Sequence, residues 1–72
     1  MEEKEFVEVQ GTVTEALPNR MFRVKLDNEA MVLGILSGQM ARHKIRVLLG
    51  DRVTLELPII DLTKGRIIRR LS

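Results

Sequence analysis

Apolar and polar residues alternate with a period of two along much of the chain, which is the pattern of half-buried β-strands. In the first such stretch, Val7, Val9 and Val13 share one face, and polar residues such as Glu8 occupy the other. Three similar stretches follow, and together with the first they cover residues 7–14, 21–26, 52–57 and 66–71. The alternation therefore predicts four strands separated by turns.

A further strand, third along the chain, is predicted over residues 31–36, where the pattern is apolar on both sides. We expect Leu33 and Ile35 to face the core, while Val32 and Leu36 blur the alternation. Two-sided apolarity of this kind favours a central strand, or one that is covered by a connection. The predicted core comprises Val7, Val9, Val13, Phe22, Val24, Leu26, Leu33, Ile35, Ile45, Val47, Val53, Leu55 and Ile67.

The period breaks after residue 36, where Ser37 can cap a helix of about one turn and Met40 is expected to close the mouth of a barrel. Five short strands in an open sheet would leave long unpaired edges, and closure into a barrel removes them. The predicted fold is all-β, a five-stranded OB-fold Greek-key barrel with a short helical turn between strands three and four. An SH3-like barrel is the competing architecture. Gly11 is expected at a bend where the first strand serves both sides of the barrel.

Length and composition limit the chemistry that this chain can perform. Its 72 residues suffice for one domain over residues 1–72, with residues 1–5 as a flexible acidic tail. Cysteine is absent, there is a single histidine, and no paired carboxylates or metal-ligand cluster can be found, so we expect no enzymatic activity, metal or cofactor. The longest apolar run has four residues and the N-terminus is acidic, which argues against a membrane span or a signal peptide and favours the cytoplasm.

Charge is distributed unevenly between the two halves of the chain. Residues 1–36 hold four basic and seven acidic side chains, a balance of −3, whereas residues 37–72 hold eight basic and three acidic ones, a balance of +5. Such segregation is typical of a surface that binds a polyanion, and we expect the cations to form one continuous wall. Apart from Arg52, the basic residues of the second half form two clusters, namely Arg42, His43, Lys44 and Arg46, and then Lys64, Arg66, Arg69 and Arg70.

Phe6 and Phe22 are the only aromatic residues, which is too few for the stacking platform of a single-strand binder. The pattern instead favours recognition of a folded RNA or a duplex by charge and shape, with cations on the phosphates. A protein-interaction barrel that binds no RNA is the alternative.

The neighbours of Arg46 at 45 and 47 are apolar, so we expect Arg46 to project from a rigid element opposite the core, where it can contact a phosphate. Arg23 is expected to extend the basic patch. Arg69 and Arg70 are adjacent on a strand and point to opposite faces, so only one can face the RNA, and we favour Arg70. Gly65 is expected to let the backbone approach a phosphate.

Several blocks of the sequence resemble bacterial translation initiation factor one and its plastid counterparts, an S1-like family. The most specific are Leu-Pro-Asn-x-Met-Phe-Arg at 17–23 and Lys-Gly-Arg-Ile at 64–67. Further blocks at the family's order and spacing lie at residues 10–13, 26–28, 37–40, 45–48, 50–53 and 61–63. Lys44, Ile60 and Arg69 stand where family members commonly have aromatic residues.

The resemblance implies an OB-fold protein without enzymatic activity that binds the small ribosomal subunit at the decoding (A) site. There it would contact the decoding stem of the 16S-type ribosomal RNA and an adjacent ribosomal protein. It would block early entry of elongator tRNA and assist the other initiation factors, as a monomer in the cytoplasm or, alternatively, in the plastid stroma. The family's basic positions match Arg42, Arg46, Lys64, Arg66 and Arg70.

Overall fold

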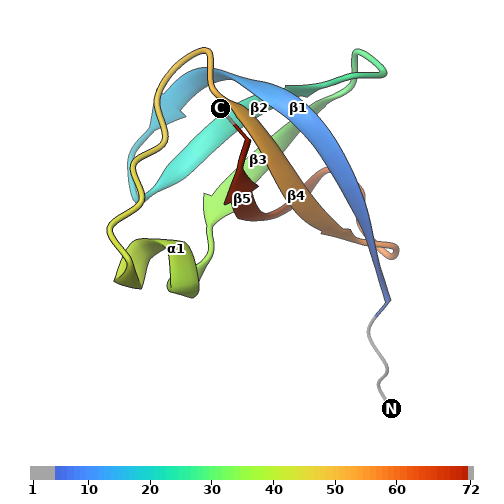
Figure 1. Cartoon of the computed structure of the whole chain (residues 1–72). Coiled ribbons are helices and arrows are strands. Elements are labelled where there is room, and N and C mark those ends of the chain that lie inside the picture. The colour runs from blue at the N-terminus through green and yellow to red at the C-terminus, as the bar shows by residue number, and fades with distance from the viewer. Residues whose placement is uncertain (1–4, 72) are drawn as a thin grey trace.

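The computed structural model describes residues 5–71 of the chain. Within this range, five strands and one short helix follow one another (Figure 1). They are β1 (Phe6–Leu17), β2 (Met21–Leu26), β3 (Met31–Leu36), α1 (Gly38–Arg42), β4 (Arg52–Pro58) and β5 (Lys64–Arg70). The predicted strands are all present, although β1 runs further than expected and β5 begins two residues earlier.

The strands close into a barrel in the order β1-β2-β3-β5-β4. Neighbouring strands are antiparallel except β3 and β5, which pair in parallel from Leu33↔Lys64 to Leu36↔Ile67. Figure 1 shows α1 at one end of the barrel, from which a long connection leads back to β4. The predicted OB-fold barrel with a short helix between strands three and four is confirmed.

β1 is the strand that two neighbours share. Its first half pairs with β4 and its second half with β2, and Gly11 pairs with Leu26 on one side and Val53 on the other. A Cβ on Gly11 would lie 2.6 Å from the carbonyl oxygen of Lys25, so only glycine permits this approach. The predicted role of Gly11 is confirmed, and a register shift between Val13 and Glu15 marks an irregularity further along the strand.

The core fills the inside of this barrel. Met40 is 3% exposed and closes the barrel at α1, as predicted. Ser37 caps the helix as expected, because its Oγ accepts a hydrogen bond of 3.2 Å from the N–H of Met40. Two predicted core residues, Val7 and Ile45, are instead 39% and 38% exposed. The buried apolar residues are Val13, Val24, Leu26, Val32, Met40, Val47, Val53, Leu55, Leu57 and Ile67, with Val9, Phe22 and Leu36 packed against them.

The prediction of which face of β3 lies inside was wrong. Val32 and Gly34 are buried, while Ile35 is 39% exposed and Leu33 only half-buried. Because Gly34 has no side chain, Ile67 can occupy the space next to it. A Cβ on Gly34 would lie 2.9 Å from Cγ1 of Ile67. Glycine does not count as a hydrophobic residue in the alternation pattern. The pattern therefore assigned the face with Leu33 and Ile35 to the core, although the opposite face lies inside.

Gly65 allows β5 to lie close to β4. The sequence had instead predicted that this glycine lets the backbone approach a phosphate. A Cβ at this position would collide with the backbone carbonyl oxygen of Glu56 and lie 2.7 Å from Cδ2 of Leu57. The space beside Gly65 is therefore occupied by the protein itself, and the predicted phosphate approach was wrong.

Replacing Gly65 by Ala should lower the free energy of unfolding by about 1–3 kcal/mol, the usual cost of overpacking, because a backbone carbonyl cannot move aside as a flexible side chain can. Gly38→Ala is the matched control, since a Cβ there meets no atom within 4 Å. Urea unfolding of the two variants measures the difference. Equal stability of Gly65→Ala and Gly38→Ala would contradict the packing role.

Candidate nucleic-acid interface

The α1–β4 loop, residues 43–51, carries most of the first predicted basic cluster. Lys44 has a left-handed backbone with a φ of 58°, and its N–H donates to the carbonyl of Ala41 at 3.1 Å. The N–H of Ile45 donates to the carbonyl of Met40 at 3.0 Å. These bonds end the helix and fix the start of the loop, where the side chains of Arg42, His43 and Lys44 are exposed to solvent.

Arg46 follows in the middle of this loop and lies on neither a strand nor a helix. The next residue, Val47, is 7% exposed and belongs to the core, whereas Arg46 is exposed. The far end of the loop is tied to β1, because the N–H of Gly50 donates to the carbonyl of Val13 at 2.9 Å. Arg46 thus lies between fixed points and projects away from the core, as expected.

Arg70, at the end of β5, lies next to this loop. Its Nη1 donates to the backbone carbonyl oxygen of Arg46 at 3.0 Å. The adjacent Arg69 lies elsewhere, 3.5 Å from the carboxylate of Glu8. We call Arg42, His43, Lys44, Arg46 and Arg70 the loop cluster; none of them makes an ion pair with another residue of the described range 5–71.

The remaining predicted residues, Arg23, Lys64 and Arg66, lie together on the outer surface of β2, β3 and β5. The register places Arg23 opposite Leu33 and Leu33 opposite Lys64. These residues, one from each of β2, β3 and β5, therefore form one row across the sheet. Arg66 belongs to the next row, beside Ile35. We call Arg23, Lys64 and Arg66 the sheet cluster.

The two clusters reach opposite ends of β5. Lys64 begins β5 and Arg70 ends it, which separates them by about 20 Å at the usual rise of a strand.

The two clusters also differ in how their charges are balanced. In the sheet cluster, Arg23 is paired with Glu15 at 3.3 Å and Arg66 with Glu56 at 2.7 Å. Such exposed pairs add little to stability, but each carboxylate cancels a positive charge that would otherwise attract a polyanion. The loop cluster therefore contributes most of the accessible positive charge among the predicted site residues.

An apolar groove that the sequence did not indicate lies beside the sheet cluster. Its volume is about 480 Å³, and Phe6, Ile35, Leu36 and Pro58 line it together with Lys64. The groove was missed because Ile35 was assigned to the core.

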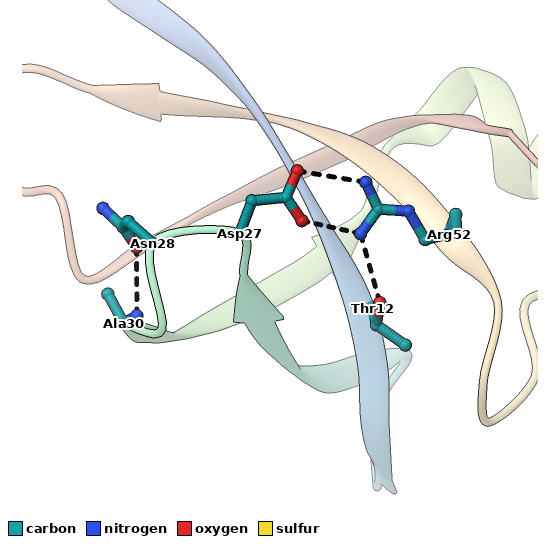
Figure 2. A network of polar contacts seen from close by, with 5 residues as sticks. All are labelled: Thr12, Asp27, Asn28, Ala30 and Arg52. Atoms are coloured by element: carbon teal, nitrogen blue, oxygen red, sulfur yellow. Dashed lines mark hydrogen bonds and ion pairs between the residues drawn. The ribbon is translucent and has the colours of Figure 1, made fainter.

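A third arrangement, built on Arg52, stabilises the barrel (Figure 2). The guanidinium of Arg52 binds both carboxylate oxygens of Asp27, at 2.7 and 3.1 Å, and also donates to Oγ1 of Thr12 at 3.2 Å. The hydrogen bond from Arg52 lowers the pKa of Asp27 below its ordinary value of 3.8, and the same bond raises the pKa of Arg52. This network joins the β2–β3 turn to β4 across β1.

Within residues 5–71, no group of three or more His, Cys, Asp or Glu side chains could hold a metal ion. The helix in this range is also not long and apolar enough to cross a membrane. The described part of the molecule is a small closed barrel with an exposed cationic loop, and its topology places it in the OB-fold class.

Comparison with known proteins narrows this class. The family of translation initiation factor 1A / IF-1 matches residues 1–72. Proteins named translation initiation factor IF-1 1 from Burkholderia pseudomallei and Burkholderia mallei are 57% identical over 67 residues, which is 93% of this chain and 76% of theirs. The chain therefore belongs to the translation initiation factor 1A / IF-1 family, a family of non-enzymatic translation factors.

Solved structures agree with this assignment. The solution structure of the translation initiation factor IF-1 from the Wolbachia endosymbiont of Brugia malayi superposes with a TM-score of 0.78 and 52% identity, over 93% of this chain and 79% of that one. The crystal structure of YjeQ from Thermotoga maritima has a TM-score of 0.74 at 24% identity, over 92% of this chain and 23% of that one, and shows the fold alone. The resemblance that the sequence motifs carry is confirmed.

Replacing Asp27 by Asn should lower the free energy of unfolding near neutral pH, and the deficit should shrink in acid. Arg52 depresses the pKa of Asp27 below 3.8 in the folded protein, so folding favours the charged carboxylate. That contribution is complete above about pH 5 and is lost as the pH falls through the folded pKa.

Urea unfolding of wild type and Asp27→Asn across this range measures the effect. Repeating the comparison in an Arg52→Met background supplies the control, because there the difference should no longer depend on pH. A deficit in the original background that stays constant well below the ordinary pKa of Asp would contradict the ion pair.

Proposed function

We propose that this protein binds the small ribosomal subunit at the decoding (A) site, through ribosomal RNA, and assists initiation-complex assembly with the other initiation factors. Membership of the IF-1 family supports the class of partner. The observation that carries the site is the loop cluster, whose exposed cations have no carboxylate partner among the described residues.

A cation without a carboxylate partner suits a phosphate contact for a simple physical reason. When it neutralises a phosphate, it releases a condensed counterion and gives up no existing ion pair. Within residues 5–71, Arg46, Arg42 and Lys44 meet this condition, and His43 adds a hydrogen-bonding group. Arg23 and Arg66 must first leave Glu15 and Glu56, so they are proposed as secondary contacts with Lys64 beside them.

The mode of recognition follows from the aromatic residues. Phe22 is half-buried against the core, and Phe6 lines the apolar groove at another part of the barrel. The two rings therefore form no common surface on which successive bases could stack. Binding should depend on phosphate charge and on the shape of a folded RNA stem, which fits the proposed decoding stem.

The remaining features of the proposal come from the family resemblance. The factor would occupy the decoding site as a monomer, formed by one domain over residues 1–72, and so delay entry of elongator tRNA. Its named relatives are bacterial proteins, which favours a bacterial cytoplasm over a plastid stroma. The proposed flexible tail at residues 1–5 lies outside the described residues except for Glu5, whose carbonyl accepts from the N–H of Ile59 at 3.0 Å.

A protein contact is the second candidate function, and the apolar groove favours it. The adjacent ribosomal protein that the resemblance implies is the proposed partner at this surface. The alternative is a barrel that binds only protein, and nuclease treatment distinguishes it from RNA binding. Capture of a single protein that survives nuclease digestion would favour that alternative, and loss of ribosomal components on digestion would favour RNA binding.

Replacing Arg46 by Ala should weaken binding to the purified small subunit by roughly tenfold or more, the usual effect of losing a charge-assisted hydrogen bond. The slope of log affinity against log salt should also fall by about 0.7–0.9, the value for one lost phosphate contact. Fluorescence titration at several salt concentrations measures both quantities.

Arg23→Met is the matched control, because it removes a cation that Glu15 already balances, and its effect should be much smaller. Urea unfolding checks that both variants fold. Wild-type affinity in a folded Arg46→Ala variant would reject the loop cluster as the RNA site.

A further inference from the structure

The side chain of Arg70 is directed at the protein's own backbone. Its Nη1 donates to the carbonyl oxygen of Arg46 at 3.0 Å, although the two residues lie 24 positions apart in the sequence. Among the described residues, no other hydrogen bond reaches the backbone of Arg46. Other hydrogen bonds fix the neighbouring parts of the loop. The hydrogen bond from Arg70 holds the backbone of Arg46, whose side chain is the candidate RNA contact.

Arg70 is well placed to hold the loop because its own backbone is fixed. It pairs with Val53 of β4 at the end of β5. Just beyond it, the N–H of Leu71 donates to the carbonyl of Arg52 at 2.7 Å. The guanidinium therefore extends from the barrel wall, and its planar group of N–H donors is aimed at the loop.

We infer that Arg70 is a positioning residue, which holds the α1–β4 loop so that Arg46 is presented to the RNA in a single arrangement. The inference rests on the proposed function and differs from the direct phosphate contact that the sequence suggested for Arg70. A loop that is ordered before binding loses less conformational entropy when the RNA binds. Arg70 would thus raise affinity through Arg46 and make no phosphate contact itself.

The two roles can be separated with Arg70→Met, which keeps an apolar stem but removes both the donor and the charge. If Arg70 positions Arg46, the variant should bind the small subunit about five- to tenfold more weakly with an unchanged salt slope. Amide hydrogen exchange in the free protein should accelerate at residues 45–48 and stay unchanged in β1 and β4. Arg70→Lys, which keeps a donor, should recover part of both effects.

A double-mutant cycle with Arg46→Ala gives the most direct readout. If Arg70 acts through Arg46, adding Arg70→Met to Arg46→Ala should cost little further affinity, whereas two independent contacts should give additive losses. Arg69→Met is the matched control, because it removes the same charge from the next residue of β5, where the guanidinium faces Glu8. It should leave loop exchange unchanged.

Additive losses together with a salt slope reduced by about 0.7–0.9 would overturn the positioning role and make Arg70 a phosphate contact. Unchanged exchange at residues 45–48 in Arg70→Met would overturn it as well, and exchange is measured without RNA. Failure of the proposed function looks different, because Arg46→Ala would then bind the subunit like wild type. In that case the exchange rates alone decide whether Arg70 orders the loop.

Discussion

Closure of the barrel around β1 determines where the other strands and the α1–β4 loop lie. β1 pairs with β4 along its first half and with β2 along its second, and Gly11 makes the change of partner possible. Because β4 is fixed to β1 in this way, β5 is held between β4 and β3, and its last residues reach the α1–β4 loop. The meeting of Arg70 with Arg46 is therefore a product of the closed topology, not of sequence proximity.

The distribution of carboxylates decides which cations remain available. The sequence has no Asp or Glu from Ala30 to Gly50 or from Thr63 to Ser72, so no member of the loop cluster has an acidic neighbour along the chain. On the barrel wall, by contrast, strand pairing brings acidic and basic residues side by side, as with Glu56 and Arg66. One fold thus presents a loop with accessible positive charge and a wall on which much of the charge is balanced internally.

Much of this could be predicted from the sequence, because period-two alternation indicates strands whatever their partners. The errors have identifiable physical causes. The inner face of β3 was misassigned because Gly34 gives no hydrophobic signal, although it leaves room for Ile67. The role of Gly65 was misjudged because its close neighbour, the carbonyl of Glu56, belongs to another strand.

The candidate site was predicted less completely than the fold. Basic residues can be counted in a sequence, but whether a carboxylate lies opposite each of them depends on strand register. For that reason, the sequence could not reveal the ion pairs of Arg23 and Arg66 or the separation of the two clusters. Alternation sends Arg69 and Arg70 to different sides of β5, and in the structure Arg69 faces Glu8 while Arg70 lies beside Arg46. The choice of Arg70 as the residue that faces the RNA stays a prediction.

Chemical footprinting of the small subunit decides whether the protein binds at the decoding site, because it locates the bound protein on the RNA. We expect the wild-type protein to protect adenines of the decoding stem. Arg46→Ala should lose this protection at concentrations where Arg23→Met retains it. Protection confined to other regions of the RNA, or equal protection by all three proteins, would contradict these expectations.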